Sequence, residues 1–268
     1  MIDTSWTPTA PAFVLGQSVL GKDIPCWLVS PIVQERKLDT VLSKLPHLHT
    51  LMIGAFHGDE PQSTQVVEAL LAKVLDNASA LTAPIGIIPC LNPDGLVANT
   101  RTNARGVDLN RNWPTQVVPQ SLMEGSDGLP PECDPITPYY AGPTPLSEPE
   151  TQALHALIQQ TQPKQILSLH QPYRLINYDG PAEGLANRMA QAFVTNTPYP
   201  VTADIGYPTP GSFGTYWGVE RQIPVITLEL PENDPLETVC NEVLPGLLAV
   251  LPWKHDIPLM PLSKDDLC

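Results

Sequence analysis

The chain has few basic residues and no long apolar run. Lysine and arginine occupy 14 of 268 positions against 28 aspartates and glutamates, which gives a formal net charge of −14. Proteins that bind nucleic acids need a basic surface, so this composition argues against a polyanionic partner. No stretch approaches the roughly 20 consecutive apolar residues that a membrane-spanning helix needs. We therefore expect neither a nucleic-acid partner nor a membrane partner.

Paired cysteines and a secretory signal are also missing from the sequence. The five cysteines are odd in number, scattered, and contain no C-x-x-C pair. This pattern indicates reduced thiols and excludes both a disulfide framework and a zinc knuckle. Residues 1–11 carry no basic residue ahead of an apolar core, unlike a signal peptide. These features favour a cytoplasmic protein.

Short apolar runs alternate with helical patterns along the rest of the chain. Two runs around a glycine-containing turn, 14–20 and 24–29, indicate a β-hairpin. Four further runs predict buried strands at 48–56, 85–91, 165–169 and 225–230. Apolar residues at helical spacing predict helices that start at Pro61 and at Pro149, and over 185–194, 211–221 and 238–250. Residues 147–150 match a capping box, and Pro245 is expected to bend or break the last helix.

This alternation predicts an α/β fold with a mixed, mostly parallel sheet, helices on both faces and an antiparallel N-terminal hairpin. We find no domain boundary and expect residues 1–268 to form a single catalytic domain. The proline-rich stretch 114–149 is an unusually long loop, and such loops are often functional. Ligands of open α/β sheets bind beyond the carboxyl ends of strands, where His57, His170 and Glu229 fall.

A metal site is the first chemistry that these strand ends suggest. His57 and Glu60 follow a buried strand and precede a helix, but a histidine and a carboxylate three residues apart are common by chance. Catalytic zinc takes three protein ligands and keeps a fourth position for water. Of the remaining histidines, only His170 ends an apolar strand. His57, Glu60 and His170 are therefore the candidate ligands, although His170 alone could equally be a core histidine.

Two further features supply a base and a carboxylate clamp. Glu229 is an acid in an otherwise apolar strand, which is costly unless it is used or paired. We interpret it as a general base, with a buried salt bridge as the alternative. Residues 101–113 hold three arginines and three asparagines, and guanidinium groups bind carboxylates and oxyanions. A metal, a base and a carboxylate clamp together describe an exopeptidase that acts on a peptide with a free C-terminal carboxylate.

Taken together, the motifs resemble the M14 family of zinc carboxypeptidases over roughly residues 14–232. They occur in the family's order: His57-Gly58-Asp59-Glu60, Asn92-Pro93-Asp94-Gly95, Gly106-Val107-Asp108-Leu109-Asn110-Arg111-Asn112-Trp113, Ser168-Leu169-His170 and Thr227-Leu228-Glu229-Leu230. The resemblance implies that His57, Glu60 and His170 bind one Zn²⁺ ion.

The same resemblance implies roles for the residues around the metal. Glu229 would be general base and proton shuttle, and Arg101 would stabilise the oxyanion. Asn110 and Arg111 would hold the terminal carboxylate, and Tyr207 would be the mobile active-site tyrosine. Asp59 is expected to orient a ligand or to cap the helix that starts at Pro61. Arg105 and Arg174 have no role in the family pattern, and either could contact substrate or solvent.

Within the family, residues 206–214 look most like the bacterial murein peptide amidases. This implies hydrolysis of the γ-D-glutamyl–meso-diaminopimelate bond during peptidoglycan recycling. Near Gly214 the sequence offers neither an apolar pocket floor nor an acid, and Arg174 is a candidate for a polar pocket. The alternatives are a general metallocarboxypeptidase acting on ordinary C-terminal residues, an N-acyl amino acid deacylase of the succinylglutamate type, and a catalytically inactive binding module. The complete Gly106–Trp113 signature argues against the deacylase, and the presence of every ligand and the base argues against the inactive module.

Overall fold

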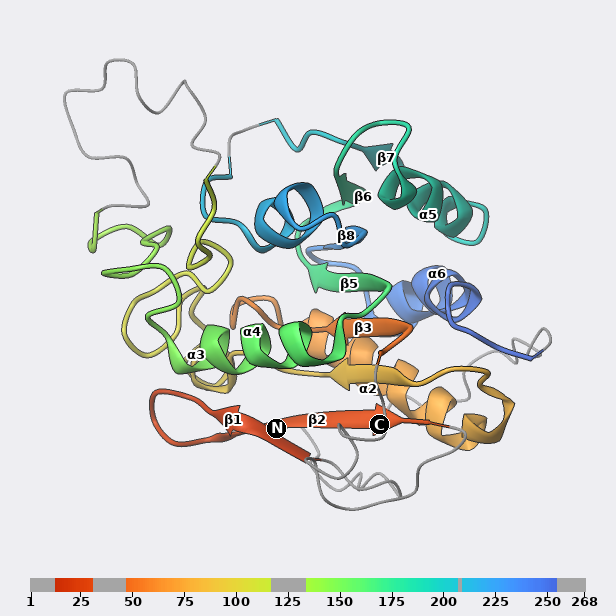
Figure 1. The fold of residues 1–268 in the computed structure, drawn as a ribbon, viewed down its shortest axis with the longest axis horizontal. Coiled ribbons are helices and arrows are strands. Elements are labelled where there is room, and N and C mark those ends of the chain that lie inside the picture. Colours follow the sequence, from red (N-terminus) through yellow and green to blue (C-terminus); the bar gives the residue numbers. More distant parts are fainter. Residues whose placement is uncertain (1–12, 31–46, 117–133, 207–208, 255–268) are drawn as a thin grey trace.

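An eight-stranded sheet forms the centre of the computed structural model, which describes residues 13–30, 47–116, 134–206 and 209–254. The strand order is β1-β2-β4-β3-β5-β8-β6-β7. In Figure 1 the strands follow one another from β1 at the bottom to β7 at the top. Their bounds are β1 Phe13–Gln17, β2 Asp23–Val29, β3 Thr50–Ile53, β4 Ile85–Ile88, β5 Gln165–His170, β6 Tyr173–Asp179, β7 Val201–Thr202 and β8 Val225–Pro231. The predicted hairpin and the four predicted buried strands are confirmed, with β3 and β4 shorter than expected.

Parallel pairing dominates the middle of the sheet. Strand β3 pairs in parallel with β4 and β5, and β5 pairs in parallel with β8. The hairpin β1–β2 is antiparallel, and β2 continues antiparallel onto β4. The predicted mixed, mostly parallel fold is therefore confirmed. Strand β6 was not predicted, and it lies antiparallel to β8 directly after the end of β5.

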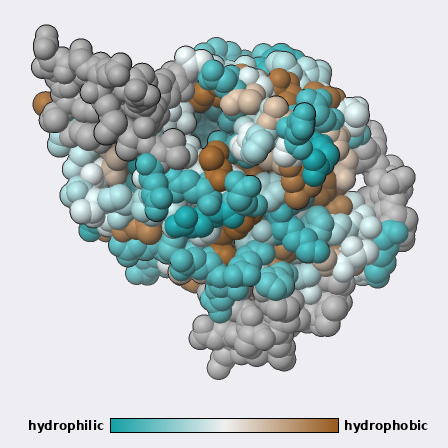
Figure 2. Space-filling model, turned by 45° about the horizontal axis from the view of Figure 1, so that its top comes forward, coloured by the Kyte–Doolittle hydropathy of each residue, from teal (hydrophilic) through white to brown (hydrophobic). Residues whose placement is uncertain are grey.

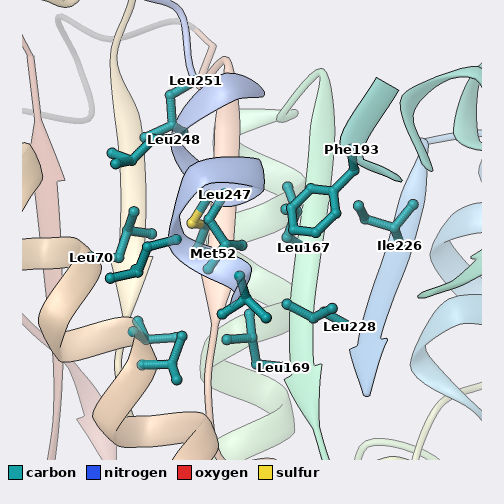
Figure 3. Close-up of a cluster of buried hydrophobic side chains, with 14 of the residues drawn as sticks. Met52, Leu70, Leu167, Leu169, Phe193, Ile226, Leu228, Leu247, Leu248 and Leu251 are labelled. Atoms are coloured by element: carbon teal, nitrogen blue, oxygen red, sulfur yellow. The ribbon is translucent and has the colours of Figure 1, made fainter. Parts of the chain in front are cut away.

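Helices cover both faces of the sheet, as expected. Their bounds are α2 Pro61–Asp76, η1 Ala78–Ala80, α3 Pro93–Ala98, α4 Pro149–Thr161, α5 Leu185–Val194, η4 Thr215–Glu220 and α6 Leu236–Ala249. Helices α2, α5 and α6 pack on one face, where Leu70, Phe193 and Leu247 meet strand residues such as Met52 and Leu167 (Figure 3). Helix α4 and the short π-helix η4 cover the other face. The buried apolar surface of both layers fixes the sheet between them.

Several local predictions need correction. The residues at 147–150 do not form a capping box, because α4 begins at Pro149 without a side-chain cap and Glu150 accepts a hydrogen bond from Val19 N instead. Helix α3 was not among the predicted helices; Asn92 is its N-cap and accepts a hydrogen bond from Gly95 N. Helix α6 continues through Pro245 without a break. The contact between Glu150 and Val19 N joins distant segments of the chain, so the local pattern does not contain it.

One face of the molecule is mainly polar (Figure 2). Figure 2 shows a face dominated by hydrophilic residues with smaller hydrophobic areas between them. Within the described ranges, no helix has the length and apolar character required to span a bilayer. Residues 134–148 of the proline-rich stretch form irregular turns, while 117–133 lie outside the described residues.

Candidate active site

The loop between β3 and α2 carries the first two candidate ligands. Ala55 has a φ of 46°, in the left-handed region, and turns the chain away from β3. Gly58 packs directly against the backbone of Gly95, so a side chain at position 58 would collide with it. The two glycine-containing motifs therefore fit together, and this contact fixes the loop that presents His57 and Glu60. Helix α2 then starts at Pro61, as predicted.

His57, Glu60 and His170 converge in the structure. One ligand atom from each lies within 4.8 Å of the other two, and all three residues are buried. His57 Nδ1 lies 2.7 Å from Glu60 Oε1, and His170 Nδ1 lies 3.0 Å from Glu60 Oε2. The two histidine Nδ1 atoms are 3.3 Å apart. Three donors of the types that zinc prefers thus face one point, from positions far apart in the sequence.

Asp108 completes the surroundings of His57. Its Oδ1 lies 3.0 Å from His57 Nε2 and accepts a hydrogen bond of 2.8 Å from Asn110 N. Its Oδ2 accepts a hydrogen bond of 2.9 Å from Arg101 Nε. With a proton on Nε2 donated to Asp108, the lone pair of His57 Nδ1 points at the Glu60 carboxylate. A cation between these groups satisfies both, which is the arrangement expected at a metal centre.

The electrostatics of the cluster agree with this interpretation. Burial alone would lower the pKa of His57, but the carboxylates of Glu60 and Asp108 outweigh it and raise the pKa to about 9. Burial would raise the pKa of Glu60, yet His57 and His170 hold it well below its usual range. Glu60 and Asp108 therefore keep their negative charges although they are buried, and these charges favour a cation bound beside the histidines. The residues present fit a zinc ion.

Glu229 lies beside the candidate ligands. It pairs with His170 in the register of β5 and β8, so both side chains reach the same edge of the sheet. The residue is buried, and its Oε2 has no hydrogen-bond partner among the described residues. Burial raises the pKa of Glu229, with the nearby Glu60 charge adding to the effect. The alternative of a buried salt bridge is absent from the part of the chain that the structure describes.

Arg101, Asn110 and Arg111 line the same pocket. Arg101 is held by Asp108, and its Nη1 lies 3.9 Å from Glu60 Oε1. Arg111 is buried and donates to the carbonyl of Asn110, while its Nε has no partner among the described residues. Asn110 Oδ1 accepts from Phe213 N, which fixes the amide side chain at the pocket wall. The described residues form no ion pair with Arg111, so its guanidinium group is available to an incoming carboxylate.

Other residues singled out in the sequence are not part of this cluster. Tyr207 lies outside the described residues, so its position is not tested. Arg105 is largely exposed and faces Glu148, and Arg174 forms ion pairs with Asp234 and Glu242. Asp59 is exposed and does not cap α2, which has no side-chain cap. The orienting contact expected of Asp59 is made by Asp108 instead.

Three residues at or beside the pocket have no role in the sequence-based interpretation: Asp108, which lies behind His57, and Tyr139 and Asp179, which line the pocket. Asp108 belongs to the Gly106–Trp113 signature. Its place in that motif, two residues before Asn110, was the signal that could have marked it as a site residue. Tyr139, from the proline-rich stretch, lines the pocket with Arg101 Cζ 5.1 Å from its ring centre. Asp179, at the end of β6, places a carboxylate against Gly214, where the sequence indicated no acid. No local motif pointed to Tyr139 or Asp179.

Comparisons with known proteins agree with this site. Residues 12–234 match the model of the zinc carboxypeptidase family, Peptidase_M14. The chain is 36% identical over 209 residues to murein peptide amidase A of Vibrio campbellii, covering 77% of each protein. It is 35% identical over 186 residues to murein peptide amidase A of Escherichia coli K12, covering 68% of this chain and 70% of that protein.

Solved structures place the fold in the same group. The murein-tripeptide amidase of Escherichia coli O157 aligns with a TM-score of 0.64 and 27% identity, covering 94% of this chain and 95% of that one. Carboxypeptidase A of Helicoverpa armigera aligns with a TM-score of 0.67 and 18% identity, covering 91% of this chain and 68% of that one, and this likeness concerns the fold. The family match covers most of the chain and includes the three converging ligands, Glu229 and the arginine segment. The chain therefore belongs to the M14 zinc carboxypeptidases, a family of peptide hydrolases.

Proposed function

We propose that this protein is a zinc-dependent exopeptidase that hydrolyses the amide bond before a C-terminal residue. The observation that carries the proposal is the convergence of His57, Glu60 and His170 in the pocket that Glu229 and Arg111 also line. His57 and His170 would bind one Zn²⁺ through Nδ1, and Glu60 through its carboxylate. Zinc bound there supplies the Lewis acidity that lowers the pKa of a water molecule towards neutrality.

The protein's own residues account for the remaining chemistry. Glu229 takes the proton of the attacking water and passes it to the leaving amine, a role that its raised pKa suits. Arg101, held in place by Asp108, stabilises the negative charge that develops on the carbonyl oxygen. Arg111 and Asn110 bind the terminal carboxylate of the substrate. We keep Tyr207 in the proposal as a further substrate-binding residue.

We propose a murein peptide as the substrate, cleaved between γ-D-glutamate and meso-diaminopimelate during cytoplasmic peptidoglycan recycling. Support comes from the murein peptide amidases, which are 35% and 36% identical to this chain over most of their length. Their names state an amidase acting on murein peptides, and we extend that activity to this protein.

The test compares two kinds of substrate. Zinc-loaded protein is incubated with murein tripeptide and, separately, with N-blocked dipeptides that end in ordinary residues; succinylglutamate is included to detect a deacylase. Mass spectrometry then measures the free amino acid that each reaction releases. We expect rapid release of diaminopimelate and much slower release from the other substrates. Release of diaminopimelate at the rate of the enzyme-free control, with turnover of the dipeptides, would identify a general carboxypeptidase instead.

A further inference from the structure

Below the candidate metal site, the sheet presents side chains in rows to the pocket. Directly paired residues point to the same face, so β5, β8 and β6 form three such rows. The first row, at the carboxyl edge, holds His170, Glu229 and Leu175; the second holds Ser168, Thr227 and Asn177; the third holds Ile166, Val225 and Asp179. Of the third row, Asp179 lines the pocket, while Ile166 and Val225 are buried in the core. The side chains of the three rows therefore run from His170 and Glu229 at the carboxyl edge to the carboxylate of Asp179 in the third row.

Asp179 ends β6 and contacts the segment that covers this face. A methyl group on Gly214 would collide with the Asp179 carboxylate, and a methyl group on Gly218 would lie 2.6 Å from its Cβ. Two glycines therefore leave space for this side chain where any other residue would fill it. Both Gly214 and Asp179 line the pocket that contains His57 and Glu229.

The Asp179 carboxylate has no hydrogen bond or ion pair with any residue that the structure describes. Its desolvation raises its pKa to about 7, and no partner compensates for the effect. Apart from histidines, the cations that line the pocket within the described ranges are Arg101 and Arg111, and both lie beside Asp108 at the catalytic end. Arg174, expected as a pocket residue, is occupied by Asp234 and Glu242. An ionised Asp179 carboxylate therefore has no counter-ion among the described residues. A cationic group on the substrate can supply one.

We propose that Asp179 is a specificity-determining residue that binds an ammonium group at the end of a long C-terminal side chain of the substrate. This inference rests on the proposed exopeptidase function. With the terminal carboxylate at Arg111 and the scissile bond at the metal, the terminal side chain enters the pocket over the second row. Four residues separate the first row from the third along β8, which corresponds to about 13 Å. The side chains of Glu229 and Asp179 occupy part of this backbone separation, and only a long, extended terminal side chain reaches across the remainder to the Asp179 carboxylate.

Two terminal residues carry the required chemistry. Lysine ends in an ammonium group, and diaminopimelate ends in an ammonium group with a carboxylate beside it. Norleucine has nearly the same length as lysine but no charge, so it isolates the contribution of the ammonium group. A contact between ammonium and carboxylate that excludes water contributes about 10- to 100-fold in kcat/KM.

The test uses zinc-loaded protein and γ-D-glutamyl substrates that end in meso-diaminopimelate, lysine or norleucine. We expect the wild-type protein to favour both ammonium-bearing substrates over norleucine. Asp179→Asn should lower kcat/KM for those two substrates by about 10- to 100-fold and leave the norleucine substrate unchanged. Asp23→Asn serves as the control, because Asp23 is an exposed acid in β2, which four strands separate from β6, and does not line the pocket.

Three results would overturn the assignment. They are equal turnover of lysine and norleucine substrates by the wild-type protein, an equal fall for all three substrates in Asp179→Asn, and no change in the variant. The first comparison needs only wild-type protein, so it stands even when the variant fails to fold. Repeating the series with a benzoylglycyl acyl group separates this proposal from the murein substrate. Preference for lysine over norleucine on benzoylglycyl substrates, without turnover of γ-D-glutamyl ones, contradicts the murein proposal and supports the role of Asp179.

Discussion

Replacing Asp108 with asparagine should weaken zinc binding without removing a ligand. Asp108 lies 3.0 Å from His57 Nε2 and accepts from Arg101 Nε and Asn110 N at 2.9 and 2.8 Å. Asparagine keeps the shape but offers a single acceptor oxygen, so its amide N–H group opposes the donor of either Arg101 or His57. His57 then loses the negative charge that raises the basicity of its ring.

Loss of such a hydrogen-bonded carboxylate behind a histidine ligand typically lowers metal affinity 10- to 100-fold, or about 1.4 to 2.7 kcal/mol. Competition with a chromogenic chelator measures this change directly. Asp94→Asn is the matched control, because Asp94 is also buried, accepts a hydrogen bond from Leu20 N, forms an ion pair with Lys22 and does not line the pocket. Equal zinc affinity in Asp108→Asn and Asp94→Asn would refute the positioning role of Asp108.

Three further predictions follow from the site. Arg111→Ala should raise KM by about 10- to 100-fold with a smaller effect on kcat, because a charge-assisted contact with the substrate carboxylate is lost. Steady-state kinetics on murein tripeptide measures KM and kcat separately, and an unchanged KM contradicts the prediction. Zinc should raise the midpoint of thermal unfolding of metal-free protein in a concentration-dependent way, and His170→Ala should abolish most of this rise in calorimetry. The pKa of Asp179, about 7 in the folded chain against 3.8 for the free group, means that its ionisation destabilises the folded state. This destabilisation is absent below pH 3.8, grows as the pH rises to about 7 and is complete above it. Its upper limit is about 4 kcal/mol, and the true value is smaller because Asp179 is partly exposed to solvent. Asp179→Asn should therefore be more stable than wild type at pH 8 and lose this advantage towards pH 4, and denaturant unfolding at both pH values shows whether the difference has this sign.

The sequence was sufficient to predict the elements whose signals are local. Apolar runs identified β3, β4, β5 and β8, and helical spacing identified α2 and α5. Because parallel strands end at one edge of a sheet, the sequence alone predicts that His57, His170 and Glu229 converge. The family motifs then connected the arginine segment with this edge.

The remaining features depend on contacts between distant segments. Glu150 was assigned to a capping box, but it bonds to Val19 N in the N-terminal hairpin, and no local pattern contains that contact. Strand β6 was not predicted because it follows directly after β5, without a helix between them. Its partner β8 is distant in sequence: Asp179 pairs with Val225, which lies 46 residues further along the chain. Without β6, nothing in the sequence placed Asp179 beside Gly214. The pocket that governs substrate choice was therefore less predictable than the catalytic centre.

Turnover by a zinc-loaded Glu229→Gln variant tests the central claim most directly. Glutamine preserves the volume of Glu229 but cannot accept a proton, while His57, Glu60 and His170 remain to bind the metal. Elemental analysis first establishes one zinc per chain in both proteins, and release of diaminopimelate from murein tripeptide is then measured. We predict that kcat falls by about 10²- to 10⁴-fold at full zinc occupancy. A variant that binds one zinc and retains wild-type kcat would contradict Glu229 as the general base and, with it, the proposed mechanism.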